Sequence, residues 1–246
     1  MTPEPPSESA APLSEAGRIT GVYFDPKTAF ADIAARPRPF VPLILLVVAA
    51  VAFTYCFTTR IGWQHYITQT MENNPRVQNL TPEQRQTQIE AGAKFAPILG
   101  YVGSVIGIPI VALIVAGVLV LMCKMVGAQL QFKTMFGITS YAMLPGLISS
   151  ILAIIVMFLK NPEDFNLQNP LFFNAGAFFT PPPTTGKFLY SLASSIDLFT
   201  FWNIALLAVG ISVAARKVPF SKALTAVIIP WVIWVLVKSA WAGAFG

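Results

Sequence analysis

The residue types that carry most enzyme chemistry are scarce in this chain. His65 is its only histidine, which excludes zinc sites that need histidine pairs and argues against Ser-His-Asp triads and histidine-based phosphotransfer. His65 follows Trp63 in a stretch typical of a membrane interface, where polar side chains lie beside aromatic rings. We therefore interpret His65 as an interfacial residue and not as a metal ligand or a catalytic base.

Motifs for phosphate chemistry are also missing from the sequence. The G-x-x-x-x-G-K-[ST] phosphate loop does not occur, because Gly186 and Lys187 are not followed by Ser or Thr. Membrane lipid phosphatases use K-x6-R-P, whereas eight residues separate Lys27 from Arg36 and Pro37 here. We therefore predict no enzymatic activity, no catalytic residue, no cofactor and no bound metal.

Asp197 is the acidic residue nearest an apolar block, and Thr200 and Asn203 follow it at helical spacing, roughly on one face. Ionisable groups inside a membrane are functional candidates by default, so Asp197 and Asn203 form a candidate intramembrane polar site. In the first turn of a helix, however, a carboxylate also satisfies free amides and the positive end of the helix dipole. We favour this capping interpretation of Asp197.

Gly103 and Gly107 form a G-x-x-x-G pattern in an apolar block. Such glycines allow two helices to approach closely, so we take them as candidate helix-packing residues. Packing inside the bundle is the favoured interpretation. A homo-oligomer joined through this face is the alternative.

The composition of the chain indicates that lipid, and not water, surrounds most of it. The chain of 246 residues is 55% hydrophobic and 11% charged, whereas soluble domains carry about 25% charged residues. Its apolar blocks are each long enough to cross a hydrocarbon core of ~30 Å as a helix. We predict an all-α polytopic membrane helical bundle of about five transmembrane helices. The domain is expected over residues 21–246, with spans at 40–59, 95–125, 135–159, 195–215 and 222–241.

The N-terminal region is predicted to hold a tail and a short helix. Residues 1–20 are rich in Pro, Ser and Glu, so we predict a disordered tail. Asp25 then suits an N-cap, Pro26 suits the first helical position, and Pro37 enforces a stop. The apolar residues of this helix, among them Phe30, fall on one side. That pattern favours an amphipathic helix lying on the membrane surface, with a solvated linker helix as the alternative.

Two connections are expected to be long. Residues 60–94 form a polar segment in which Thr81, Pro82 and Glu83 predict the start of a helix. Residues 160–187 are rich in Asn, Pro and Phe and include three consecutive prolines at 181–183. This second connection is not predicted to form one regular helix.

The basic residues predict the orientation and a candidate interaction surface. With the N-terminus inside, the inner segments hold nine Lys and Arg residues and the outer segments hold seven. The net charge of +5 does not indicate nucleic-acid binding, because no basic run is interleaved with aromatic residues. Basic residues at the ends of helices meet anionic headgroups instead. The candidate surface consists of Lys27, Arg36, Arg38, Lys133, Arg216, Lys217 and Lys222.

Three segments carry a resemblance to a known family. They are FDPKTAFADIAARPRPFVPLILL, YAMLPGLISSILA and SIDLFTFWNIALLAVGISVAARKVPFSKALTAVIIPWVIW. Over residues 20–240 the chain resembles a bacterial-type member of the Yip family, membrane proteins named for binding Rab-type GTPases. The resemblance implies a five-span domain with a cytosolic N-terminus, and we expect it in the bacterial cytoplasmic membrane. The DLYGP motif of the eukaryotic relatives is missing, since Asp25 is followed by Pro-Lys-Thr.

Two functions are compatible with this pattern. The favoured one is a non-enzymatic membrane scaffold or adaptor whose cytoplasmic face contacts membrane lipids or a protein partner, because the basic residues gather there. The alternative is a small transporter or channel subunit that uses Asp197, Asn203 and helices interrupted at Pro109, Pro145 and Pro230.

Overall fold

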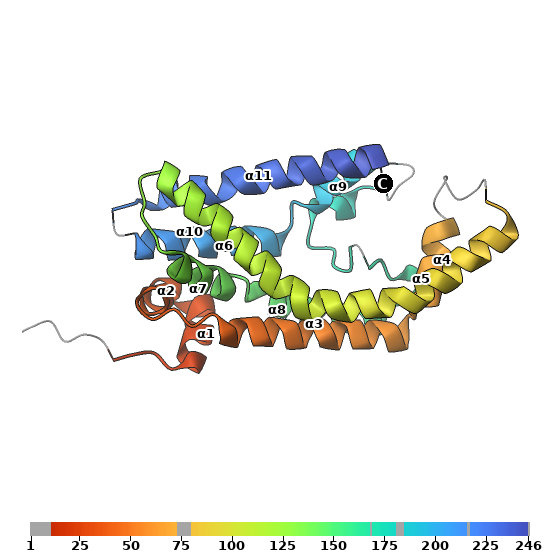
Figure 1. Ribbon diagram of the computed structural model, residues 1–246, viewed down its shortest axis with the longest axis horizontal. Helices are drawn as coiled ribbons and strands as arrows, with labels where there is room; N and C mark the ends of the chain where they lie inside the picture. Colours follow the sequence, from red (N-terminus) through yellow and green to blue (C-terminus); the bar gives the residue numbers. More distant parts are fainter. Residues whose placement is uncertain (1–10, 73–79, 168, 181–184, 216, 246) are drawn as a thin grey trace, which may run out of the picture.

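The structure is a computed structural model that describes residues 11–72, 80–167, 169–180, 185–215 and 217–245. In these residues the protein is a bundle of helices elongated along one axis and contains no β-strand (Figure 1). The α-helices are α1 (Glu15–Phe24), α2 (Pro26–Ala35), α3 (Phe40–Arg60), α4 (Trp63–Glu72), α5 (Pro82–Val102), α6 (Ile108–Met125), α7 (Phe132–Ala142), α8 (Pro145–Leu159), α9 (Lys187–Ser194), α10 (Leu198–Ala214) and α11 (Phe220–Phe245).

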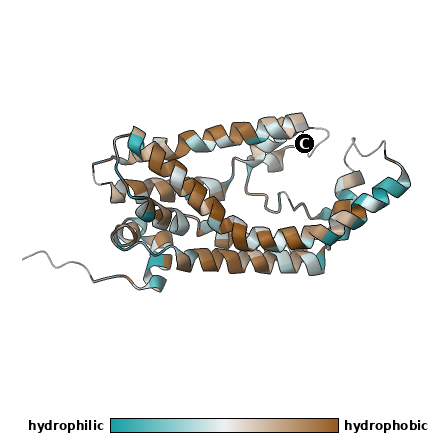
Figure 2. Cartoon of the chain, viewed as in Figure 1, coloured by the Kyte–Doolittle hydropathy of each residue, from teal (hydrophilic) through white to brown (hydrophobic). Residues whose placement is uncertain are grey.

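Four helical stretches are long and apolar enough to cross a membrane. They are Phe40–Arg60, Pro82–Met125, Phe132–Leu159 and Phe220–Ala244. The apolar helix α10 is shorter, and its 17 residues measure about 25 Å at 1.5 Å per residue. Hydrophobic residues occupy the middle of the long axis and hydrophilic residues occupy its ends (Figure 2). The predicted all-α membrane bundle is therefore confirmed, with four full-length spans and one shorter apolar helix.

The predicted N-terminal tail is wrong for residues 15–20, which belong to α1. Ser14 is the N-cap of this helix, and its hydroxyl accepts a hydrogen bond from the Gly17 amide at 3.0 Å. Residues 1–10 of the predicted tail lie outside the described residues. The composition of the segment predicted disorder, but a helix forms there because its cap and its tertiary contacts stabilise it.

Helix α2 has the bounds that the sequence predicts. The Asp25 carboxylate caps it and Pro26 is its first residue. Its apolar face, however, does not rest on lipid, because Ala29, Phe30 and Ile33 are fully buried in the main core of the protein. The helix packs against α7 and α10. The predicted amphipathic helix is correct, and its predicted position on the membrane surface is wrong.

The helix start predicted at Thr81, Pro82 and Glu83 is confirmed, and this helix is continuous with the predicted second span. Thr81 forms a capping box with Gln84, and the helix then runs on from Pro82 through the polar turns that were assigned to a loop. Gln, Glu, Ala and Lys are good helix formers, so the helix continues where the hydropathy falls. The residues Gly103–Gly107 form a π-helical segment just before Pro109. Proline cannot donate the usual hydrogen bond, and the wider turn is one way in which a helix passes such a residue.

The third span is interrupted as its proline predicts. Helices α7 and α8 are separated by Met143 and Leu144, and Pro145 is the first residue of α8. Pro230, by contrast, lies inside the continuous helix α11.

The predicted fourth span corresponds to α10, and a further helix, α9, precedes it. The helices α9 and α10 both pack along α11, and the chain between them at 195–197 is not helical (Figure 1). Backbone hydrogen bonds join this break to the preceding connection, from Ala175 to Ile196 and from Leu198 to Phe173. The connection 160–187 contains only short 3-10 turns in its described part, as predicted, and its three prolines lie outside that part.

Close packing fixes the position of α10 against α2 and α7. A Cβ atom on Gly210 would lie 2.4 Å from Ile138 Cγ2 and 3.1 Å from Phe30 Cδ1. Only glycine allows the helices to approach this closely. The N-terminal helix α2 is therefore an integral part of the bundle and not an appendage.

Candidate functional site

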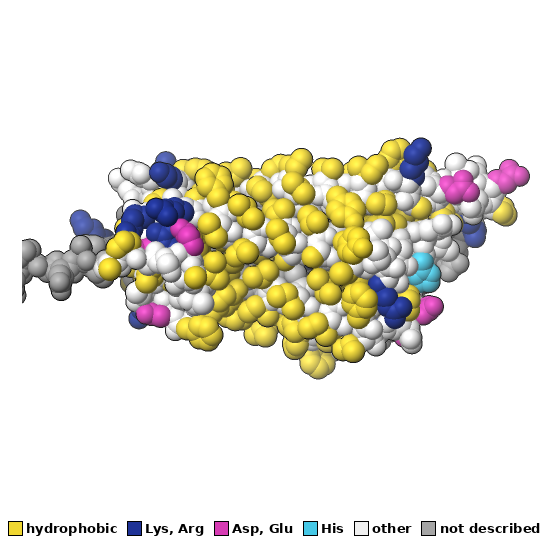
Figure 3. All heavy atoms as spheres, turned by 90° about the horizontal axis from the view of Figure 1, so that it is seen from below, with side chains coloured by type: hydrophobic (Ala, Val, Ile, Leu, Met, Phe, Trp, Pro, Cys, Tyr) yellow, Lys and Arg dark blue, Asp and Glu magenta, His cyan; other side chains and the backbone are white. Residues whose placement is uncertain are grey.

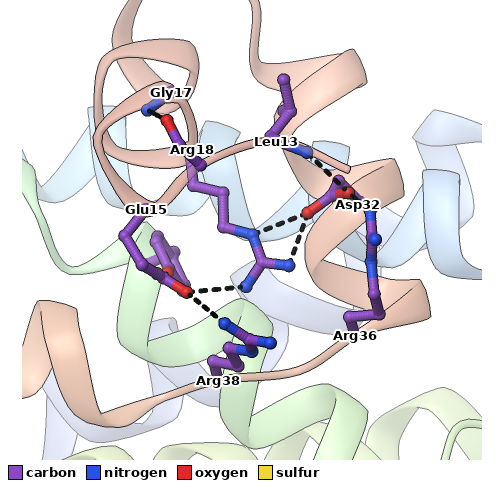
Figure 4. A network of polar contacts seen from close by, with 9 residues as sticks. Leu13, Glu15, Gly17, Arg18, Asp32, Arg36 and Arg38 are labelled. Carbon is purple, nitrogen blue, oxygen red and sulfur yellow. Dashed lines mark hydrogen bonds and ion pairs between the residues drawn. The ribbon is translucent and has the colours of Figure 1, made fainter. Parts of the chain in front are cut away.

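A buried arginine lies where α1 and α2 meet the rest of the bundle. The Arg18 side chain is only 2% exposed and forms an ion pair with Asp32, whose side chain is 9% exposed, at 2.6 Å. Asp32 also accepts hydrogen bonds from the Arg36 guanidinium and from the Leu13 amide. Figure 4 shows these side chains pointing toward one another from α1, α2 and the segments beside them. We call the side chains of Glu15, Arg18, Asp32, Arg36, Arg38 and Tyr141 the N-terminal ion network.

Glu15 extends this network to the membrane-spanning helices. Its carboxylate lies 3.4 Å from the guanidinium nitrogens of Arg18 and Arg38. The Tyr141 hydroxyl of α7 donates to the same carboxylate at 2.5 Å. The network therefore joins α1, α2 and the segment before α3 to the third span.

The charges of the network stabilise each other. Burial by itself raises the pKa of Asp32, but hydrogen bonds from Arg18, Arg36 and Leu13 outweigh burial and leave that pKa lowered. Burial would likewise lower the pKa of Arg18, and hydrogen bonding with Tyr141 and Asp32 leaves it raised. Both groups are therefore ionised at neutral pH, and neither charge is buried alone.

A second contact holds α1 to the break between α7 and α8. The Tyr23 hydroxyl donates to the Leu144 carbonyl at 2.7 Å, and the Tyr23 ring meets Trp202 of α10 edge to face, with ring centroids 5.7 Å apart. Carbonyls at a helix break need partners outside the helix, and this tyrosine supplies one. Its pKa is raised by burial.

The predicted basic surface lies at the same end of the molecule. The helices α1 and α2 and the connections α6–α7 and α10–α11 all lie at one end of the long axis (Figure 1). Basic and acidic side chains gather at this end, and a broad apolar band separates it from the charged groups of the other end (Figure 3). The side chains of Lys27, Lys133, Lys217 and Lys222 are exposed. Arg38 is 67% exposed despite its contact with Glu15.

Two residues of the predicted surface differ from the others. Arg36 is engaged by Asp32 and so belongs to the N-terminal ion network as well as to the surface. Arg216 lies outside the described residues. Five residues of the predicted surface are therefore exposed in the described structure, Lys27, Arg38, Lys133, Lys217 and Lys222, and we call them the basic face.

The predicted helix-packing glycines do not contact another helix of this chain in the described structure. A Cβ atom on Gly103 or Gly107 would meet no atom within 4 Å. One turn earlier, a Cβ atom on Gly100 would lie 3.0 Å from the Trp63 ring and 3.2 Å from Thr54. Close packing of this span therefore occurs at Gly100. A contact of Gly103 and Gly107 with a second copy stays a prediction.

The predicted intramembrane residues are found at the start and in the interior of α10. Asp197 is the N-cap of this helix and accepts hydrogen bonds from the amide and the hydroxyl of Thr200. Asn203 lies two turns further on, and its Oδ1 is buried with no hydrogen-bond partner among the described residues. The structure does not bring these two side chains into one hydrogen-bonded group in its described part.

Comparison with known proteins identifies the family. The Yip1 domain matches residues 20–242 of the chain. The chain belongs to the Yip1 domain family. Membrane protein YknW of Bacillus subtilis (strain 168) is 26% identical over 208 residues, which cover 83% of this chain and 81% of that protein. No solved structure matches.

The match of the Yip1 domain begins inside α1, after Arg18. Sequence reasoning counted Arg18 only as a positive charge beside a span, and it assigned no role to Glu15, Asp32 or Tyr141. A signal for α1 was present, because Ser14 followed by Glu15 is typical of a helix start. The described part of the domain contains no cluster of His, Cys, Asp and Glu that would hold a metal ion.

Proposed function

We propose that this Yip1 domain protein is a non-enzymatic membrane scaffold or adaptor whose basic face contacts membrane lipids or a protein partner. One observation carries the proposal. The N-terminal ion network uses the acidic residues Glu15 and Asp32 internally and leaves the lysines of the basic face and Arg38 at the surface. This end of the bundle therefore presents an excess of positive charge to membrane lipids or to a protein partner.

The apolar residues beside the basic face support contact with lipid headgroups. Phe24 is 87% exposed and Met125 is 78% exposed, and both lie at the end of the bundle that carries α1 and α2. Large apolar side chains beside lysines are typical of the interface, where the rings and stems meet acyl chains and the ammonium groups meet phosphates. Anionic lipid attracts each basic residue near the surface by about 1 kcal/mol.

We further propose that this end faces the cytoplasm, with the protein in the bacterial cytoplasmic membrane. Short connections flanked by Lys and Arg stay on the cytoplasmic side. Lys124 at the end of α6 and Lys133 at the start of α7 flank one such connection, and Lys217 and Lys222 lie in and beside the α10–α11 connection. Reporter fusions after residues 128 and 175 test the orientation. A cytoplasmic reporter at 128 and an external one at 175 are expected, and the opposite pair would overturn the orientation.

The lipid contact is tested with a triple variant that leaves the ion network intact. Lys27→Gln, Lys133→Gln and Lys222→Gln remove three exposed charges. The variant and the wild type are reconstituted in phosphatidylcholine bilayers with spin-labelled phosphatidylglycerol. We expect the preference for phosphatidylglycerol over phosphatidylcholine to fall by about 1 kcal/mol per substitution.

The matched control makes the same change of charge at the other end of the bundle. It combines Lys94→Gln, Lys187→Gln and Lys238→Gln, and we expect it to keep most of the lipid preference. Equal losses in the two triple variants would show that net charge alone sets the preference and would refute a specific role of the basic face. A protein partner is tested by in-cell crosslinking from position 27, with position 238 as the control.

A further inference from the structure

A cavity with both polar and apolar lining lies where α10 begins. Its volume is about 140 Å³, and it is not closed off from the surface. One water needs only about 10–15 Å³ on such a measure, so the cavity is large enough for a molecule of several heavy atoms. It is lined by Ser149, Asn169, Pro170, Leu171, Phe173, Asn174, Ser194, Asp197 and Phe199.

The break between α9 and α10 creates this cavity. Because α10 starts at Leu198, Asp197 lies part-way along the long axis and not at its end (Figure 1). The connection before α9 folds back against this break through hydrogen bonds at Phe173 and Ala175. Helix α8 closes the cavity on another side with Ser149.

The polar groups around the cavity are mainly hydrogen-bond acceptors. Asn174 donates both of its amide hydrogens to other groups, to Leu171 O at 2.7 Å and to Asn169 Oδ1 at 2.6 Å. Its own Oδ1 accepts only a long contact of 3.4 Å from Asn169. The carboxylate of Asp197 accepts from Thr200 and keeps further lone pairs.

Ser194 belongs to the wall of the cavity. Its Oγ is buried, and no group among the described residues forms a hydrogen bond with it. A Cβ atom on Gly176 would lie 2.3 Å from this oxygen and 2.9 Å from Asn174 Oδ1. The two oxygens therefore lie close to one point, and a buried hydroxyl without a partner is costly in an apolar bundle.

The lining of the cavity favours a cation with a carbon skeleton. No Lys or Arg is among the described residues that line it, and Asp197 gives it a formal negative charge. The rings of Phe173 and Phe199 meet edge to face at 6.2 Å and add two aromatic groups, which attract cations through their faces. An anion would find mostly acceptors here. A bare metal ion would leave most of the volume empty.

We propose that this cavity binds a small organic cation through a primary ammonium group, with Asp197 as the counter-charge and the Asn174 side-chain oxygen as a further acceptor. Ammonium groups donate three hydrogen bonds and form strong ones with carboxylates. The cation can be a soluble amine or the headgroup of an aminophospholipid, since both present the same group. The proposal rests on the cavity and is independent of the basic face.

Calorimetric titration of ethylammonium chloride into the full-length protein in non-ionic detergent tests the proposal. We expect saturable binding of one molecule per chain, with ethanol and sodium chloride as inactive control solutes. Asp197→Asn should weaken the binding at least tenfold. Asparagine caps helices as well as aspartate does, so this variant keeps an acceptor for the Thr200 amide and loses only the acceptor for the Thr200 hydroxyl. Glu163→Gln removes one charge from an exposed residue of the same connection and should leave binding unchanged.

If Asp197→Asn does not fold, a second variant tests whether ethylammonium binds in the cavity. Ser149→Leu places an apolar side chain in the cavity from α8 and should abolish binding, whereas Ser150→Leu makes the same change beside the cavity and should not. Absence of binding to the wild type, equal binding to Asp197→Asn, or displacement by sodium at the same concentration would overturn the proposal.

Reconstitution in nanodiscs distinguishes the two sources of the ammonium group. If phosphatidylethanolamine in the disc weakens ethylammonium binding relative to phosphatidylcholine, the site takes a lipid headgroup. Equal binding in the two lipids assigns it to a soluble amine. Either result supports an ammonium site.

Discussion

Replacing Asp32 by asparagine should release the N-terminal helices from the bundle. The substitution keeps the size of the side chain and one oxygen, but it leaves the Arg18 guanidinium, 2% exposed, without its closest counter-charge. Glu15 stays 3.4 Å from Arg18 and compensates in part. Removing one partner of a buried pair costs 3–5 kcal/mol, so we expect about 3 kcal/mol here.

Hydrogen exchange of the α1 and α2 amides measures this loss directly, because local opening of these helices exposes them. A loss of about 3 kcal/mol corresponds to roughly 100-fold faster exchange. The matched control is Arg38→Gln, which removes the ion pair with Glu15, 3.4 Å long, whose arginine is 67% exposed. Exposed pairs contribute about 0–1 kcal/mol, so its exchange should rise less than about fivefold. Equal exchange in the two variants would refute the assignment of Arg18 and Asp32 as the anchor of α1 and α2.

Two further results are expected from the same packing. The pKa of Asp32 is lowered in the folded protein. Its contribution to the stability of α1 and α2 should therefore be fully present above the unfolded pKa of about 3.9 and be lost as the pH falls through the folded pKa. Hydrogen exchange in α1 and α2, corrected for its intrinsic rate, should be constant from about pH 5 to 8 and rise only in acid. Gly210→Ala should destabilise the protein by about 1–3 kcal/mol through overpacking against Ile138. The control Gly117→Ala adds a methyl group where nothing lies within 4 Å and should leave the stability unchanged. Thermal unfolding in detergent compares the two variants, and equal stability would contradict the close packing at Gly210.

The spans were predictable because hydropathy and length are local properties of the chain. The span that starts at Phe40 has the predicted beginning, and the break at Pro145 follows from a missing amide hydrogen. The helix start at Pro82 was predicted from its cap, but its continuity with the second span was not, because helix formation continues through polar residues that lie outside the hydrocarbon. Local signals thus give the number and order of the helices better than their ends.

The N-terminal ion network and the cavity at Asp197 depend on contacts between residues far apart in the sequence, so the sequence predicts them less well than the spans. The cap role of Asp197 was visible from its position before an apolar block. The ion pair of Arg18 and Asp32 was not, because 14 residues and a helix break separate the two side chains. The amphipathic pattern of α2 predicted that an apolar surface covers Phe30. It could not show that α7 and α10, instead of lipid, provide this surface.

The N-terminal ion network also connects the fold to the proposed function. Lys27 and Arg38 come from the N-terminal region, whereas Lys133 and Lys222 lie in the first turns of α7 and α11, so the basic face is continuous only while α2 is docked. Asp32→Asn adds one positive unit to this end, and simple attraction would raise the preference for anionic lipid by about 1 kcal/mol. If a continuous face is required, release of α2 should lower the preference instead. A rise in phosphatidylglycerol preference in this variant, measured by the same spin-label experiment, would show that the charges act independently and that docking of α2 serves stability alone.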